Sequence, residues 1–144
     1  MKRLLSFILP LLILTSCTPN SDSSSASTKE EEKMKLEIDK NVLDVSWNNN
    51  ASVTALNEIK PLTINMRLYG GFEQTGSIGR SIVRNDSQID VVPGDIVLYG
   101  GNAISVFYSI SSWSYTRLGH INLNENELNA LLNKESVTFV LKGE

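Results

Sequence analysis

The residue types that most often carry chemistry are scarce in this chain of 144 residues, which has one histidine, His120, and one cysteine, Cys17. A histidine can act as a general base near neutral pH. No serine or cysteine is arranged with His120 in a nucleophile motif, however, and a single histidine on a strand is usually structural. The sequence also contains no cluster with metal-ligand spacing, no phosphate-binding loop and no dinucleotide fingerprint. We therefore expect neither a metal nor a cofactor.

Cys17 follows a segment with the properties of an export signal. After a positively charged start at Lys2-Arg3, residues 4–14 are mostly apolar but too few for a permanent membrane span. The run Leu14-Thr15-Ser16-Cys17 resembles the bacterial lipobox, whose cysteine is lipidated and becomes the new N-terminus. An ordinary signal peptide with an incidental cysteine is the alternative. The sequence predicts a signal peptide over residues 1–17 and an extracytoplasmic protein of the bacterial cell envelope, anchored in the membrane through the lipid on Cys17.

Composition divides the rest of the chain into two parts. Residues 18–33 contain almost no apolar side chains and cannot bury enough surface to fold, so we expect a disordered tether. Residues 34–144 have a length that suits one compact domain. The whole chain carries 13 Lys and Arg against 16 Asp and Glu, and no basic patch stands out. Nucleic-acid binding is therefore not expected.

The hydrophobic pattern of residues 34–144 is mainly that of β-strands. Residues 62–69 alternate most regularly, with Leu62, Ile64, Met66 and Leu68 on one face, which is typical of a strand with one side in a core. Polar segments are expected to be loops, among them residues 81–88 and a serine-rich stretch that carries Trp113. The expected elements are strands at 35–38, 42–47, 62–69, 72–78, 96–99, 103–108, 115–121 and 137–141, and helices at 52–59 and after Asn124.

These elements predict a closed or nearly closed barrel of about eight strands, with two short helices covering its openings. Pro93-Gly94-Asp95 is a turn signal, and we expect the Asp95 carboxylate to bind nearby backbone amides. Strict alternation along residues 115–121 would place Arg117 and His120 on opposite faces of their strand.

Two longer runs resemble the small bacterial cyclophilin-like proteins. They are Pro93-Gly94-Asp95-Ile96, continued by Leu98-Tyr99-Gly100-Gly101-Asn102, and Ser112-Trp113-Ser114-Tyr115-Thr116-Arg117-Leu118-Gly119. Thr54-Ala55-Leu56 and Pro61-Leu62 agree with them, and the resemblance extends from Met34 to Leu141. It implies a compact eight-stranded β-barrel like that of cyclophilin, a peptidyl-prolyl isomerase. It does not imply an agreed activity.

The resemblance also allows the isomerase machinery to be sought residue by residue. Rotation about an X-Pro bond breaks amide resonance and faces a barrier of about 18–20 kcal/mol. An isomerase needs an apolar groove for the proline and a cation near the amide. Arg67 falls on the arginine of true cyclophilins and Phe72 on their groove phenylalanine. Gln74 lies one place before the position of their glutamine, which is occupied by Thr75.

The remaining positions depart from true cyclophilins. Tyr108 replaces a phenylalanine, Tyr115 replaces the groove histidine, and Val106 replaces a second glutamine. Their tryptophan position is Ile110, with Trp113 nearby. The candidate groove therefore consists of Arg67, Phe72, Gln74, Tyr108, Trp113 and Tyr115.

Each candidate also has a structural interpretation. Arg67, on the polar face of its strand, is either an isomerase arginine or a surface residue paired with an acid such as Glu73. The aromatic residues either line a groove or belong to the core, and we expect Phe107 or Tyr108 to be core. Trp113 is expected to be partly exposed.

Two functions remain after this comparison. The first is a non-catalytic binding domain on a lipid tether, with an aromatic-lined groove for a peptide or small ligand. The second is a reduced peptidyl-prolyl isomerase that acts on exported proteins. The loss of the glutamine and histidine positions removes most groups that would hold the substrate backbone, which favours binding. An exposed Arg67 facing an apolar pocket with Phe72 and Trp113 would favour the isomerase, whereas a filled or absent pocket would favour binding.

Overall fold

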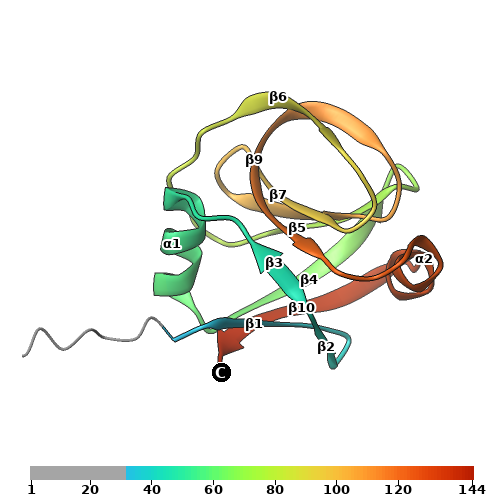
Figure 1. The fold of residues 1–144 in the computed structure, drawn as a ribbon, viewed down its shortest axis with the longest axis horizontal. Coiled ribbons are helices and arrows are strands. Elements are labelled where there is room, and N and C mark those ends of the chain that lie inside the picture. Colours follow the sequence, from blue (N-terminus) through green and yellow to red (C-terminus); the bar gives the residue numbers. More distant parts are fainter. Residues whose placement is uncertain (1–31) are drawn as a thin grey trace, which may run out of the picture. The chain divides into compact units, whose positions relative to one another are not determined.

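The computed structural model describes residues 32–144, which form a mainly β domain (Figure 1). The predictions for the signal peptide, for Cys17 and for the tether up to residue 31 lie outside the described residues. The elements are β1 (Met34–Ile38), β2 (Asn41–Leu43), β3 (Val45–Trp47), α1 (Ala51–Ile59), β4 (Leu62–Tyr69), β5 (Glu73–Ser77), β6 (Ser87–Val91), β7 (Asp95–Tyr99), β8 (Ala103–Phe107), β9 (Ser111–Ile121), α2 (Glu125–Leu132) and β10 (Ser136–Gly143).

The predicted barrel is confirmed, and one bent segment of chain closes it. The strands of the main sheet are antiparallel and follow the order β2-β1-β10-β4-β5-β8-β7-β9-β3. The strands at its two ends, β2 and β3, are consecutive in the chain and separated only by Asp44. Leu43 pairs with Leu36 of β1, whereas Val45 pairs with Ile121 of β9. The sheet therefore curls until its two edges meet in the same seven-residue segment, residues 41–47.

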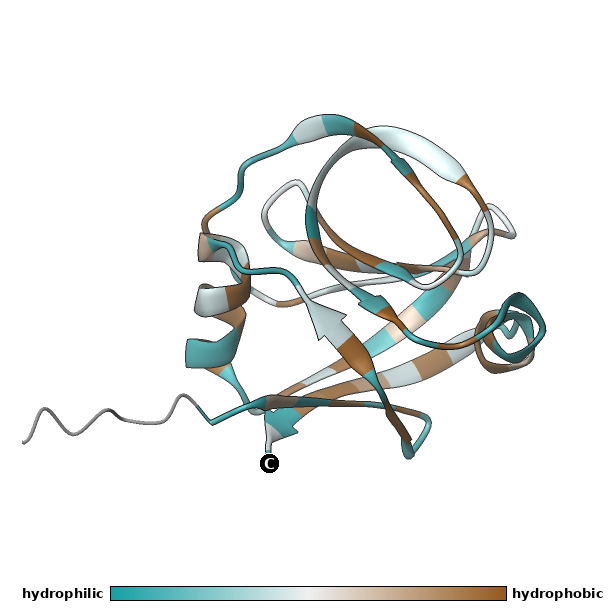
Figure 2. Cartoon of the chain, in the orientation of Figure 1, coloured by the Kyte–Doolittle hydropathy of each residue, from teal (hydrophilic) through white to brown (hydrophobic). Residues whose placement is uncertain are grey.

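Alternation along the strands separates an inner core from an outer face. In β8, Ile104 and Val106 belong to the inner core, whereas Phe107 belongs to a second, smaller cluster on the outer face. Figure 2 shows apolar and polar residues alternating along the strands. The outer cluster consists of Val91, Val97, Phe107 and Tyr115, with Phe72 and Ile89 packed against it. The sheet of β5, β8, β7 and β9 thus has apolar groups on both faces.

Both predicted helices are present: α2 follows Asn124 as expected, and α1 begins at Ala51, one residue before the predicted start. The Asn50 side chain accepts a hydrogen bond of 3.0 Å from the backbone N–H of Val53 at the start of α1. Asn124 and Glu127 form a reciprocal capping box at the start of α2. Leu128, Leu131 and Leu132 of α2 are buried, as their spacing predicts.

The predicted loops around Trp113 and over residues 81–88 need correction. Strand β9 already begins at Ser111, so Trp113 lies on a strand rather than in a loop. Residues 111–115 extend beyond the barrel and pair with β6, whose first two residues fall in the predicted loop. Only Val91 of β6 is buried. This weak pattern forms a strand because the extension of β9 offers it a partner, and that partner cannot be read from local sequence.

The prediction that Arg117 and His120 lie on opposite faces is wrong, because β9 contains an irregularity beside Leu118. Ile96 pairs with Gly119 and Val97 pairs with Arg117, so two residues of β9 advance for one residue of β7. This shift turns both side chains toward Asp95. Arg117 Nη1 donates to Asp95 Oδ2 at 2.6 Å, and His120 Nδ1 lies 2.8 Å from Asp95 Oδ1.

Asp95 is buried and also fixes the turn that precedes it. The backbone N–H of Val92 donates to Asp95 Oδ2 at 3.0 Å, as the turn signal predicts. Arg117 Nη2 donates to the carbonyl oxygen of Asp90 in β6 at 2.9 Å. In the same turn, Gly94 has a φ of 99°, and a Cβ there would lie 2.8 Å from the Ile121 carbonyl oxygen. The Asp95 carboxylate and its partners therefore connect β6, β7 and β9.

We expect replacement of Asp95 by alanine to lower the free energy of unfolding by about 2–4 kcal/mol, because it leaves the Val92 N–H and the Arg117 guanidinium without their acceptor. Urea denaturation followed by circular dichroism measures this loss. Asp90→Ala is the control, since the Asp90 side chain is exposed and only its backbone carbonyl binds Arg117. We expect the control to lose less than about 0.5 kcal/mol. Equal losses in the two variants would contradict the role assigned to Asp95.

Candidate functional site

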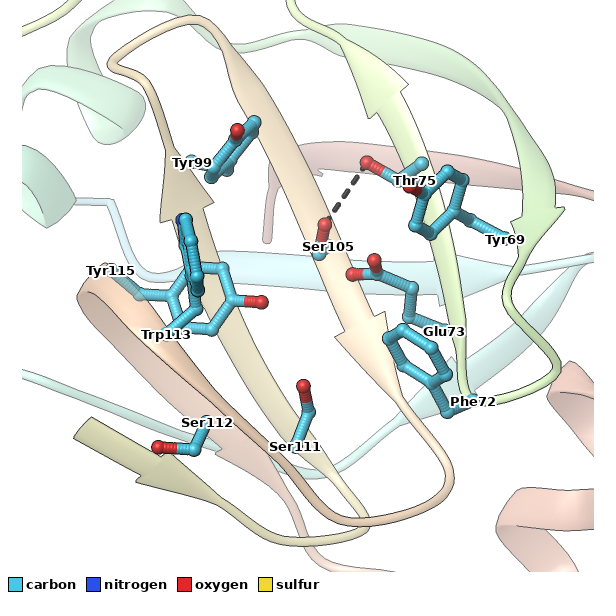
Figure 3. Close-up of a pocket in the computed structure, with 10 residues that line it drawn as sticks. All are labelled: Tyr69, Phe72, Glu73, Thr75, Tyr99, Ser105, Ser111, Ser112, Trp113 and Tyr115. Atoms are coloured by element: carbon cyan, nitrogen blue, oxygen red, sulfur yellow. Dashed lines mark hydrogen bonds between the residues drawn. The ribbon is translucent and has the colours of Figure 1, made fainter. Parts of the chain in front are cut away.

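A groove of about 440 Å³ lies on the outer face of the sheet, between β5, β8 and β7 on one side and the first half of β9 on the other. Figure 3 shows the ten residues that line it. These residues are Tyr69, Phe72, Glu73, Thr75, Tyr99, Ser105, Ser111, Ser112, Trp113 and Tyr115. A recess of this volume suits a small molecule or a few residues of a peptide.

Strand register brings the floor of the groove together. Glu73 pairs with Phe107, and Thr75 pairs with Ser105, so outward side chains of β5 and β8 lie side by side. The Ser105 hydroxyl donates to Thr75 Oγ1 at 2.9 Å. The floor is thus a short polar strip set among aromatic rings.

The aromatic rings form a continuous row across the outer face. Ring centroids are 6.1 Å apart for Tyr69 and Phe72, 6.4 Å for Phe72 and Phe107, 5.6 Å for Phe107 and Tyr115, and 6.1 Å for Tyr115 and Tyr99. Phe107 is fully buried beneath the groove. Because each ring packs on its neighbour, the walls are held in place before any ligand arrives.

Three of the lining aromatic residues remain largely exposed to water. The exposed fractions are 62% for Tyr69, 48% for Tyr99 and 58% for Trp113. Large apolar side chains gathered around a recess are typical of a binding surface. The exposure of Trp113 agrees with the sequence prediction, although it lies on a strand.

Glu73 is an unusual component of this groove. Only 7% of the residue is exposed, and its Oε2 atom has no hydrogen-bond partner among the described residues. Burial raises the pKa of the Glu73 carboxyl above its ordinary value of 4.5, and the neighbouring Ser105 hydroxyl opposes this rise. Burial also raises the pKa of Tyr115, and the charge of Glu73 adds to that rise. The ten lining residues include no lysine, arginine or histidine to neutralise the Glu73 carboxylate.

The structure brings together three of the six candidate groove residues, Phe72, Trp113 and Tyr115. Arg67 is exposed on the outer face, paired with Thr75 across the strands, but it does not line the groove. Among the ion pairs of residues 32–144, none joins Arg67 to Glu73.

Gln74 and Tyr108 must be removed from the candidate groove. Gln74 is fully buried, and its amide donates to the carbonyl oxygens of Leu132 at 2.8 Å and Lys134 at 2.6 Å, at the end of α2. Its side chain therefore faces the barrel interior, because neighbouring residues of a strand point to opposite faces. Tyr108 belongs to the inner core. This agrees with the expectation that Phe107 or Tyr108 is a core residue.

A repeated motif in the sequence marks two lining residues that are absent from the predicted groove. Leu-Tyr-Gly-Gly occurs twice, at residues 68–71 and 98–101, where a strand runs into a turn. Both tyrosines, Tyr69 and Tyr99, line the groove from the ends of β4 and β7. Glu73 and Ser105 carried no comparable signal, because their place depends on strand register.

Two further searches of residues 32–144 gave negative results. Neither helix in this part of the chain has the length and apolar character needed to cross a membrane. No group of three or more His, Cys, Asp and Glu side chains in the same residues could hold a metal ion.

Comparison with known protein families assigns the domain to one of them. A family model described as "Cyclophilin-like family" matches residues 36–142, which is nearly all of the described domain. Among curated proteins, none matches the chain.

We expect Glu73→Gln to stabilise the domain increasingly as pH rises. The folded domain holds the Glu73 proton more tightly than the unfolded chain does, so the contribution of Glu73 to stability is greatest below pH 4.5. That contribution falls as pH rises from 4.5 through the raised pKa of the folded state. Glutamine keeps the shape of the side chain and does not ionise.

Thermal unfolding of both forms between pH 4 and pH 8 measures this effect. We expect similar melting temperatures at pH 4 and a higher melting temperature for Glu73→Gln at pH 8. The control is Glu58→Gln, at an exposed position of α1. The melting temperature of this variant should not rise above that of the original chain at pH 8. Parallel pH profiles for the original chain and Glu73→Gln would contradict the raised pKa.

Proposed function

The chain belongs to the cyclophilin-like family, and on this basis we propose that it is a non-catalytic, membrane-tethered binding domain whose groove takes a peptide or small ligand. The supporting observation is an open groove that Phe72 and Trp113 line but that the exposed Arg67 does not. The pocket is therefore neither absent nor completed by Arg67, so neither of the two outcomes set out from the sequence is met in full. Tyr69 and Tyr99 each pack on a neighbouring ring, and Trp113 is carried by strand β9, yet all three stay exposed. Covering these rings with a ligand would remove apolar surface from water without first reordering the walls.

The absence of isomerase activity is proposed from the composition of the groove. Catalysis of X-Pro rotation would need a cation beside the amide, and the ten lining residues include no arginine or lysine. Gln74, the residue next to the family's glutamine position, is committed to the end of α2. Tyr115, at the histidine position, packs against Phe107 and Tyr99 instead.

One observation favours the alternative of a reduced isomerase. Arg67 lies on the same face as the groove, since it pairs with Thr75 of the groove floor across β4 and β5. An arginine side chain is long and flexible, and on a bound substrate it has room to extend along the sheet. The two functions are therefore separated by whether the Arg67 guanidinium reaches a bound X-Pro amide.

We expect a short X-Pro peptide with aromatic flanking residues to bind without faster isomerisation. Binding is followed in the full chain by the nuclear magnetic resonance signals of the two indole N–H groups, because Trp113 lines the groove and Trp47 does not. Trp113→Ala should weaken binding at least tenfold, since it removes a large apolar contact. Because this variant lacks the indole signal of the groove, its affinity and that of the original chain are compared by titration calorimetry. The control is Ile110→Ala, which removes an exposed apolar side chain that does not line the groove.

A coupled assay on the same peptide measures isomerisation. Acceleration that disappears in Arg67→Ala would make the protein an isomerase and refute the non-catalytic function. Equal weakening by Trp113→Ala and Ile110→Ala, or no change at Trp113, would refute binding in this groove.

The proposed location rests on the sequence alone. The lipobox-like run ending at Cys17 follows an export signal, and the polar residues after it would hold the domain away from the membrane surface on its outer side. This places the proposed groove in the bacterial cell envelope, outside the cytoplasm.

We expect Cys17→Ser to abolish lipid attachment, because serine offers no thiol for the thioether bond. In cells fed labelled palmitate, the original chain should carry the label and sediment with membranes. Ser23→Ala, a conservative change in the predicted tether, is the control and should behave as the original chain does. Label retained by Cys17→Ser would contradict the anchor.

A further inference from the structure

The buried carboxyl of Glu73 is not accounted for by an apolar groove. Leaving a buried polar group without a hydrogen-bond partner destabilises the folded state, and more so when the group is charged. Within residues 32–144, Glu73 Oε2 has no hydrogen-bond partner, and the nearby Ser105 hydroxyl makes its hydrogen bond of 2.9 Å with Thr75 Oγ1. Figure 3 shows the carboxyl between Phe72 and Ser105, facing the groove. The site therefore presents an acceptor that a bound ligand could satisfy.

The opposite wall of the groove suits a positive charge. Tyr99, Trp113 and Tyr115 lie across the floor from Glu73 (Figure 3). The faces of aromatic rings attract ammonium groups, tryptophan most strongly, and the attraction grows when water is excluded. A ligand cation between Glu73 and these rings would be attracted by the carboxylate on one side and by the ring faces on the other.

Among the described residues, no charged side chain around Glu73 forms an ion pair with its carboxylate, so a ligand cation would not have to displace one. Tyr69 pairs with Glu73 across the strands, and Tyr115 faces it from β9; neither side chain can carry a positive charge. Arg67 of β4 is on the same face but forms no ion pair with Glu73 among the described residues. An anionic ligand would meet a carboxylate and no lining cation.

We propose that the groove binds a small ligand bearing a primary amine, with the ammonium group donating to the Glu73 carboxylate and the apolar part covering Trp113. This inference rests on the proposed binding function and adds the chemical class of the ligand. An ammonium group supplies three donors and the opposite charge, which together satisfy a buried carboxylate.

Two probes with the same ring and chain test the inference. They are 2-phenylethylamine, which is an ammonium ion at pH 7.5, and 2-phenylethanol, which is neutral. Each is titrated into the full chain while the Trp113 indole N–H is followed, with Trp47 as the internal control and Trp113→Phe for assignment. We expect the amine to bind at least tenfold more tightly than the alcohol. Glu73→Gln should reduce this preference below threefold, and Glu58→Gln should leave it unchanged.

If Glu73→Gln does not fold, pH provides the second measurement. Protonation of Glu73 at pH 4 should lower the affinity for the amine, which stays charged, and leave the affinity for the alcohol unchanged. A preference that survives both the substitution and the low pH would overturn the role of Glu73.

The outcomes separate this inference from the proposed function. Equal affinities for the two probes, with Trp113 shifted by both, would overturn the amine specificity and leave groove binding intact. No shift of Trp113 with either probe, together with no shift by the X-Pro peptide, would overturn both proposals.

Discussion

The ion pair between the buried Asp95 carboxylate and the partly exposed Arg117 guanidinium joins the barrel to the strand pair that borders the groove. Asp95 begins β7 in the barrel wall, and Arg117 lies on β9 just after β9 leaves its pairing with β6. Through its second nitrogen, Arg117 reaches the backbone of Asp90 in β6. The pair also requires the register shift beside Leu118, because only that shift brings Arg117 and His120 to the same carboxylate. The position of Trp113 relative to the floor of the groove therefore depends on the contacts of Arg117 with Asp95 and with the Asp90 carbonyl oxygen.

The floor of the groove is held in place by the core that packs against the opposite face of the same sheet. Glu73 and Gln74 are neighbours in β5, yet they meet opposite environments because successive residues face opposite sides. The Gln74 amide is satisfied by two carbonyl groups at the end of α2, whereas the Glu73 carboxyl keeps an unpaired oxygen on the outer face. Gln74 therefore anchors the strand to α2, whereas Glu73 keeps a buried oxygen without a partner among the described residues. A site built on such a strand is held more precisely than one on a free loop.

The predictable parts of the structure were those set by local pattern. The alternation of residues 62–69 and the helix after Asn124 each follow from neighbours in sequence, and each was confirmed. The groove depended on register between distant strands. Placing Gln74 in the groove was an error of a single residue, and in a strand one residue changes the face, so Thr75 lines the groove and Gln74 enters the core. The strand β6 and the shift beside Leu118 exist only through their partners on β7 and β9.

The position of β10 in the sheet has a consequence for the timing of folding. Strands β1 and β4 are made early, yet in the finished sheet they are separated by β10, which is made last and pairs with both. During synthesis the chain therefore lacks the central strand of this part of the barrel until residues 136–143 have appeared. Contacts between residues so far apart in sequence also form slowly. A chain that ends before residue 136 would therefore leave β1 and β4 without the strand that they share.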